Sequence, residues 1–143
     1  MARTWQHLTD EITDLDQHIA TLLETINPRL LQVHGIGAAV ATQLLITCGD
    51  NPNRIRHEAS FAMLCGAAPI PASSGKTRRH RLNRGGDRKA HSALWRIAIT
   101  RMSTDQRTKN YVERRTTEGL SKRDITRCLI RYIAREIHPI LTS

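Results

Sequence analysis

The sequence predicts a mainly all-α protein, in which an N-terminal coiled-coil helix precedes a small helical domain with a helix-hairpin-helix element and an extended basic loop. Two patterns indicate this fold: apolar residues recur at helical spacing along most of the chain, and a run of cations interrupts them in the middle. With 143 residues, 39% hydrophobic and 24% charged, the chain can form one globular domain with a core, plus an appendage.

The first segment, residues 1–27, has a heptad pattern. Its apolar residues alternate at spacings of three and four: Trp5, Leu8, Ile12, Leu15, Ile19, Leu22 and Ile26. Isoleucine mostly at position a with leucine at d is typical of a coiled coil, so we expect a homo-oligomer through this seam. The alternative is a helix that packs on its own domain. Asn27-Pro28 ends the helix, because the residue before a proline disfavours helical angles.

The second segment, about residues 30–48, resembles a helix-hairpin-helix. A short helix leads into the turn His34-Gly35-Ile36-Gly37, and a second helix starts at Ala38. In such a motif glycines let backbone N–H groups approach a DNA phosphate, which makes Gly35 and Gly37 candidate nucleic-acid-binding residues. The alternative is a plain tight turn that needs glycine for a positive φ. A small apolar helix follows near residues 56–66, with a predicted core of Phe61, Met63, Leu64 and Cys65.

Residues 69–86 form the predicted serine and basic loop. Ser73 and Ser74 stand directly before Gly75. Seven cations follow: Lys76, Arg78, Arg79, Arg81, Arg84, Arg88 and Lys89. Residues 76–91 hold one acid, Asp87, and so carry +6 of the net charge of +9. Burial of unpaired guanidinium groups is too costly for a core, so this stretch faces water or a polyanion, and all seven cations are candidate nucleic-acid ligands.

Three C-terminal helices are predicted over residues 87–141. The first, about 87–102, buries Leu94, Ile97 and Ala98, and Trp95 is also assigned to the core. The second, about 105–118, ends at Gly119, a residue suited to a left-handed cap. The third opens at Ser121, which with the acid three residues on resembles a capping box.

The last helix has two predicted faces. Its buried face comprises Ile125, Cys128, Leu129, Tyr132, Ile133, Ile137 and Ile140. Four arginines recur every four residues elsewhere on it: Arg123, Arg127, Arg131 and Arg135. This stripe is either a solvated face or an extension of the basic surface.

Composition narrows the class of protein. Residues 1–75 have a net charge of −3 and residues 76–143 one of +12, so the C-terminal half is the expected polyanion face, with nucleic acid the commonest partner. Aromatics, at 3%, are too scarce for a base-stacking platform. The odd, widely separated Cys48, Cys65 and Cys128 indicate buried thiols and no zinc site. With neither a signal peptide nor a bilayer-spanning run, we expect a cytoplasmic protein and no membrane partner.

Four features in fixed order carry a family resemblance: V-H-G-I-G-x-x-x-A, A-S-F-A-M-L-C-G-A-A-P, S-S-G-K-x-R-R-H-R-L-N-R-G-G and D-R-K-A-H-S-A-L-W. Together, over about residues 28–141, they resemble the C-terminal transposase domain of the IS110 family of insertion-sequence transposases, also called the IS116 type. In that family the serine directly before the glycine is the nucleophile. The resemblance therefore assigns catalysis to Ser74, with Ser73 as its neighbour.

The resemblance also implies partners. The family joins this domain, through a coiled coil, to a ribonuclease-H-like domain whose four acidic residues bind magnesium, and it recombines DNA under the guidance of a structured RNA. DNA and a guide RNA are thus implied partners, and no cofactor or metal ligand is expected in this chain. No ribonuclease-H-like segment precedes the heptads, and their acids suit a solvated helix face. We therefore expect a fragment or remnant of a longer transposase that is inactive alone.

Three functions remain open from the sequence. The first is a recombinase domain for DNA transposition, in which Ser74 forms a phosphoserine link and Arg78, Arg79 and Arg81 stabilise the charge that builds on phosphate oxygens. The second is a non-catalytic nucleic-acid-binding module, whose serines are turn residues or phosphate hydrogen-bonders. The third is a coiled-coil interaction protein whose basic half only solubilises it.

Overall fold

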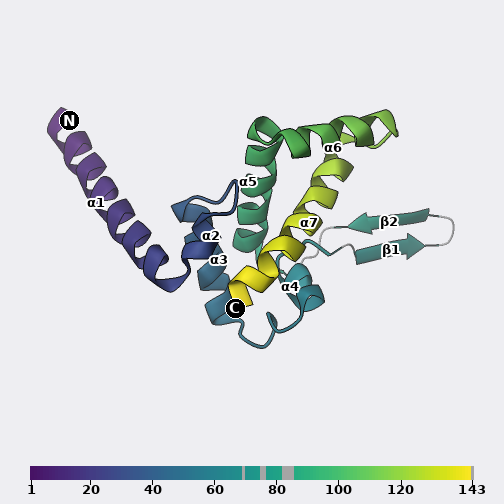
Figure 1. Ribbon diagram of the computed structural model, residues 1–143, viewed down its shortest axis with the longest axis horizontal. Helices are drawn as coiled ribbons and strands as arrows, with labels where there is room; N and C mark the ends of the chain where they lie inside the picture. Colours follow the sequence, from purple (N-terminus) through teal and green to yellow (C-terminus); the bar gives the residue numbers. More distant parts are fainter. Residues whose placement is uncertain (69, 75–76, 82–85, 143) are drawn as a thin grey trace.

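The computed structural model describes residues 1–68, 70–74, 77–81 and 86–142, and for the two short strands among them it describes the backbone (Figure 1). The described elements are α1 (Ala2–Ile26), α2 (Pro28–Leu31), α3 (Ala38–Asp50), α4 (Glu58–Leu64), β1 (Ile70–Ser74), β2 (Thr77–Arg81), α5 (Arg88–Thr104), α6 (Gln106–Thr117) and α7 (Lys122–Thr142). The prediction of a mainly all-α fold is confirmed.

Helix α5 lies at the centre and packs against α3, α6 and α7, while α4 packs against α7 (Figure 1). Its buried face combines three small residues with Leu94 and Ile97, and the small residues let neighbouring helices come close. From α7 the core receives Ile125, Leu129, Ile130, Ile133, Ala134 and Ile137. The apolar stripe read from the sequence is therefore the face that forms the core.

Three residues assigned to the core lie at its edge. Trp95, Met63 and Tyr132 are 47%, 50% and 51% exposed, and Cys128 is only half-buried. Each is next in sequence to fully or nearly fully buried residues, but the step of about 100° per residue carries its side chain off the buried stripe. Tyr132 instead meets the ring of Tyr111 edge-on, with the ring centroids 5.8 Å apart.

Helix α1 extends away from the other helices (Figure 1). Only its last turns pack on the domain: Leu23, which is outside the heptad seam, is buried, and Ile19 is half-buried against the core. The other six seam residues are 52–69% exposed: Trp5, Leu8, Ile12, Leu15, Leu22 and Ile26. Packing on its own domain therefore accounts for one end of α1 and leaves most of the seam without a partner in the described part of the chain.

The predicted helix boundaries after residue 104 are confirmed by their caps. Gly119 follows α6 with φ of +96°, the left-handed conformation that glycine adopts most easily. The Ser121 hydroxyl oxygen accepts the backbone N–H of Asp124 at 3.2 Å and donates to its carboxylate at 3.0 Å. None of the helices in the described ranges is long and apolar enough to cross a bilayer.

Candidate nucleic-acid interface

The serine pair and part of the basic stretch lie on a β-hairpin that extends beyond the helices (Figure 1). Within the predicted loop, the described residues 70–74 and 77–81 form two antiparallel strands, with Ser73 paired with Arg78 and Ser74 with Thr77. Lys76 and Arg84, two of the predicted ligands, lie outside the described residues.

The register separates the predicted arginines. Paired positions share a face of an antiparallel pair, and alternate positions return to that face. Ala72 pairs with Arg79, so Arg79 is the diagonal cross-strand neighbour of Ser74, at the roughly 7–8 Å between backbones that a long side chain can span. Arg78 belongs to the face of Ser73. The backbone thus brings the serine and arginine positions together, one arginine to each serine.

The root of the hairpin is fixed between α4 and α5. The backbone N–H of Asp87 donates to the Leu64 carbonyl at 2.6 Å, and that of Ala67 donates to the Ala62 carbonyl at 2.7 Å. At Gly86 a Cβ atom would lie only 2.8 Å from the Leu64 carbonyl oxygen. The two chain segments that lead to the strands are therefore held close to the end of α4.

Asp87, the single acid of the basic stretch, begins α5. Its carboxylate accepts the N–H groups of Lys89 at 2.9 Å and Ala90 at 3.3 Å, and the hydroxyl of the buried Thr47 on α3 at 2.8 Å. These hydrogen bonds make Asp87 the N-cap of α5 and engage both oxygens of its carboxylate. Arg88 and Lys89 are exposed and have no ion pair within the described ranges, so both predicted ligands are available beside the hairpin root.

Replacing Gly86 with alanine should lower the free energy of unfolding by about 1–3 kcal/mol, because the added methyl group meets backbone atoms that cannot rotate away. The matched control is Gly49→Ala within α3, where a Cβ has nothing within 4 Å; it should stabilise the helix by about 0.5–1 kcal/mol. Urea unfolding followed by circular dichroism measures both. Equal midpoints for Gly86→Ala and the parent chain would contradict a tightly packed root.

The two glycines of the predicted helix-hairpin-helix differ. Gly35 has φ of +91°, and a Cβ there would lie 3.2 Å from Cγ2 and 3.3 Å from the carbonyl oxygen of Ile97 on α5. Gly37 is exposed and has ordinary angles, and no side chain caps the start of α3. The geometry therefore gives Gly35 the tight-turn role and leaves the backbone at Gly37 open to solvent.

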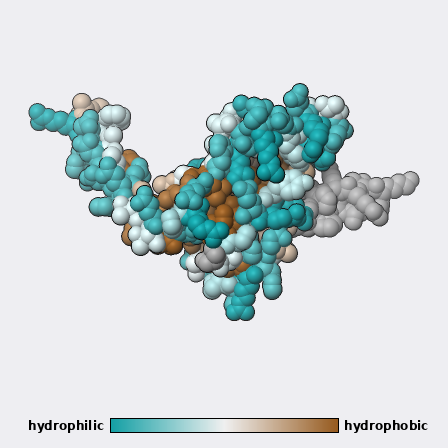
Figure 2. Space-filling view, in the orientation of Figure 1, coloured by the Kyte–Doolittle hydropathy of each residue, from teal (hydrophilic) through white to brown (hydrophobic). Residues whose placement is uncertain are grey.

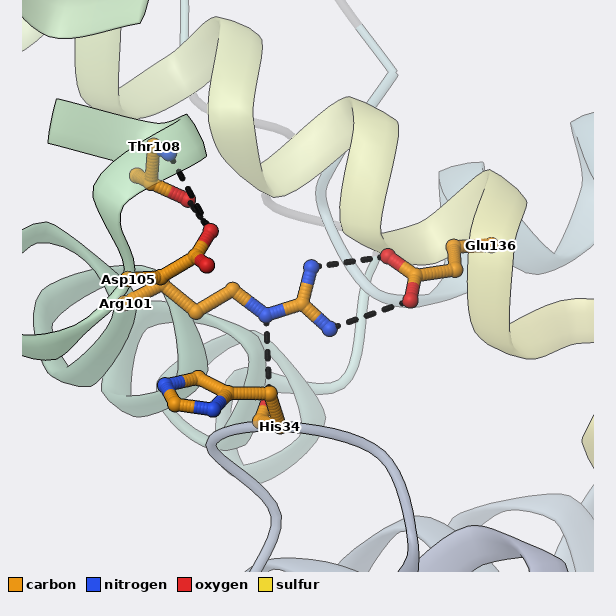
Figure 3. Close-up of polar contacts among 5 residues, drawn as sticks. All are labelled: His34, Arg101, Asp105, Thr108 and Glu136. Atoms are coloured by element: carbon orange, nitrogen blue, oxygen red, sulfur yellow. Dashed lines mark hydrogen bonds and ion pairs between the residues drawn. The ribbon is translucent and has the colours of Figure 1, made fainter. Parts of the chain in front are cut away.

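A network around Arg101 holds this turn on the domain (Figure 3). Its Nε donates to the His34 carbonyl at 2.8 Å, and its two terminal nitrogens donate to the Glu136 carboxylate at 2.7 and 3.1 Å. His34 also contacts the Thr104 hydroxyl at 2.7 Å. The Thr108 hydroxyl donates a hydrogen bond to the Asp105 carboxylate and is the main cause that lowers its pKa; the Thr108 backbone N–H adds to this effect. Arg101 thus joins the turn to α7, and its guanidinium is occupied by protein.

An open groove of about 540 Å³ lies between the glycine turn and α5. Its lining comprises Gly35, Ile36, Gly37, Val40, Trp95, Arg96, Ile99 and Thr100. Figure 2 shows hydrophobic surface gathered where α3 meets α5, and hydrophilic surface over α6. From Arg88 to Trp95, the first residue of α5 that lines the groove, is seven residues, about 10 Å along the helix, so the groove and the hairpin root are separate surfaces.

Sequence reasoning missed the contribution of Trp95 to this groove, because it assigned the residue to the core. A helical wheel carried the signal: the buried positions of α5 are 90, 93, 94, 97 and 98, and residues 95, 96, 99 and 100 fall on the opposite side of the helix. The arginine stripe of α7 is exposed throughout. Arg127 lies 3.9 Å from Asp124 and Arg135 lies 3.7 Å from Glu58.

The buried thiols of Cys48 and Cys65 are not candidates for nucleophilic attack. Burial raises the pKa of Cys48 to about 11 and that of Cys65 to about 12, so both are protonated at neutral pH. Within the part of the chain that the structure describes, no three His, Cys, Asp or Glu side chains are grouped as they would be around a metal ion.

Comparison with known proteins places these elements in a wider context. Residues 27–113 match the family described as "Transposase IS116/IS110/IS902 family", and this range includes the glycine turn, the hairpin and α5. The chain is 31% identical over 128 residues to the "Insertion element IS110 uncharacterized 43.6 kDa protein" of Streptomyces coelicolor. That alignment covers 86% of this chain and 30% of the relative, so the chain spans under a third of the relative's length.

Proposed function

Since the chain belongs to the IS116/IS110/IS902 family of transposases, we propose that it is a DNA-binding recombinase domain for DNA transposition, in which Ser74 attacks a DNA phosphodiester. The observation that carries this proposal is the hairpin register, which sets Ser74 diagonally across from Arg79 on a strand pair beyond the helical core. A DNA strand that lies along this hairpin would meet a serine position and an arginine position that are diagonal neighbours in the strand pair.

The chemistry follows from this pairing. Attack forms a bond between the serine Oγ and phosphorus and breaks one P–O bond to deoxyribose. The serine hydroxyl gives up its proton, and the deoxyribose oxygen leaves as a hydroxyl, so the protein–DNA link keeps a phosphodiester for rejoining. Negative charge builds on the non-bridging oxygens during attack, and arginine donates paired N–H groups to such oxygens. Among the described strand positions, Arg79 is the diagonal neighbour of Ser74, and Arg78 and Arg81 would extend the positive charge along the strand.

Other surfaces would hold the nucleic acid. Arg88 and Lys89 are exposed beside the hairpin root, where they suit contacts to phosphates on either side of the attacked bond. The open backbone at Gly37 suits a phosphate contact at the start of α3, and the arginines of α7 add charge. We further propose a guide RNA as a partner. The magnesium of the family would be held by its acidic domain, present in cis or supplied by another subunit.

Salt-dependent DNA binding tests the proposal. Each phosphate contact contributes about −0.9 to the slope of log K against log salt concentration for duplex DNA. Replacing both Arg78 and Arg79 with glutamine should weaken binding at every salt concentration and make the slope shallower by about 2 units. Fluorescence anisotropy with labelled duplexes, at salt concentrations from about 50 to 200 mM, measures both the binding constant and the slope.

The control for this double variant is Arg3→Gln, which removes one of the exposed charges of α1 away from the hairpin. Its slope should equal that of the parent chain. Binding that does not change with salt would overturn the proposal and favour a coiled-coil interaction protein. Salt-dependent binding without a covalent product would support the second candidate, a non-catalytic nucleic-acid-binding module that uses the same cations.

A further inference from the structure

We propose that the groove between the glycine turn and α5 holds one unstacked nucleotide of a single strand, with its base on Trp95 and its phosphate at Arg96. This inference rests on the proposed function and adds to it a binding site that is separate from the hairpin. It also qualifies the expectation from composition, because one aromatic residue in a groove can take one base even where the chain has no stacking platform.

The position of Trp95 is the first step. The large apolar residues on either side of it, Leu94 and Ile97, are fully buried, whereas the indole is 47% exposed and lines the groove. A tryptophan has a large flat surface that aromatic ligands stack on, and stacking tolerates any base because every base has a π-face. The groove therefore presents the kind of surface that an unstacked base covers.

The charge of the groove is the second step. Arg96 is exposed, lines the same groove, and has no ion pair within the described residues. None of the eight lining residues is acidic and Arg96 is a cation, so the groove favours an anionic ligand over a neutral or basic one. A nucleotide combines an aromatic base with a phosphate, and these two groups match the adjacent indole and guanidinium.

The nucleotide that enters the groove must be unstacked. A base inside a duplex is stacked on both sides and cannot reach an indole on a protein surface, so the ligand is a single strand or an extruded base. The volume, about 540 Å³, falls within the roughly 300–1,000 Å³ of sites that hold small ligands. The groove thus fits one nucleotide, and DNA and RNA share the chemistry that it recognises.

Tryptophan fluorescence provides a direct test, because the chain has two tryptophans, Trp5 and Trp95. In the Trp5→Phe variant Trp95 is the sole reporter, and stacking should quench its emission. We expect saturable quenching by single-stranded oligonucleotides and weaker quenching by duplexes of the same sequence. The matched control is Trp95→Phe, in which only Trp5, on the extended helix, reports; its emission should change little. Parallel titrations with DNA and RNA identify which backbone the groove prefers.

Affinity provides the second readout. Trp95→Ala should weaken single-strand binding roughly 5- to 150-fold and change duplex binding less than about twofold. Trp95→Phe should fall between alanine and the parent chain, because phenylalanine keeps a stacking face. The control Tyr132→Ala removes another half-exposed aromatic, on α7, and should leave single-strand affinity unchanged. Circular dichroism should show the same helix content for all variants.

Several results would overturn the inference: no quenching of Trp95 by saturating single strands, equal losses for single strands and duplexes, or equal losses for Trp95→Ala and Tyr132→Ala. Quenching that grows with protein concentration, without nucleic acid, would instead assign the groove to a second copy of the chain. If nucleic acid binds and the emission of Trp95 does not change, only this inference fails. If neither strand form binds at all, the proposed function fails with it.

Discussion

Replacing Ser74 with alanine should abolish the covalent bond between this protein and DNA and leave salt-dependent DNA binding nearly unchanged. The hydroxyl is the atom that would attack phosphorus, and alanine has no nucleophile in its place. The cations of the hairpin and of the start of α5 are unaffected, so the binding affinity should change by less than about twofold, within the range of surface substitutions. The variant therefore separates covalent attack from binding.

We propose that attack depends on the acidic domain of the family, so the measurement adds a full-length family member in trans with magnesium. That helper protein carries alanine at its own nucleophilic serine, so an adduct can come only from this 16.2 kDa chain. End-labelled DNA linked to a protein of this size is seen as a shifted band on a denaturing gel. The band should appear with the parent chain and be absent with Ser74→Ala.

Ser73→Ala is the matched control, because Ser73 is the neighbouring hydroxyl on the opposite face of the strand pair, in register with Arg78. It should keep the adduct. If Ser73→Ala loses the band and Ser74→Ala keeps it, the nucleophile is the serine paired with Arg78. If the parent chain gives no band with the helper protein, the chain binds without catalysis and the non-catalytic module is the correct function.

Helix positions could be predicted from the sequence because their signals are local. Apolar spacing identified the buried face of α7, and the turn around Gly35 and the cap at Ser121 lie where the sequence placed them. These features depend on residues within about one turn of each other, since helical hydrogen bonds join residues four apart. Tertiary packing then stabilises helices whose positions the local sequence already favours.

The strand register and the groove beside Trp95 could not be predicted from the apolar pattern of the sequence. Pairing of Ser73 with Arg78 is set by cross-strand hydrogen bonds, and the charged sequence of β2 lacks the apolar alternation that identifies a half-buried strand. Trp95 has the hydrophobicity of a core residue. The helical wheel of α5 places it off the buried stripe, but that it lines a groove depends on the glycine turn and Val40, which are distant in sequence.

The exposed seam of α1 leads to the second large effect: Leu15→Glu should convert a self-associated chain into a monomer. Leu15 occupies a d position and is 59% exposed, together with other seam residues that have no described partner. A second copy would bury it between two helices. Loss of a buried leucine costs about 2–5 kcal/mol, so self-association should weaken at least about 30-fold, and further because the two glutamates repel.

Sedimentation velocity across a range of protein concentrations measures this change. Gln17→Glu is the control of equal charge: it lies at the outer f position of the same heptad, so it should leave the association constant unchanged. Both variants keep Leu23, the residue that joins α1 to its own domain, so the fold should persist in each. A parent chain that sediments as a monomer at all concentrations would contradict self-association through this seam. A seam that pairs would also bring two hairpins into one assembly.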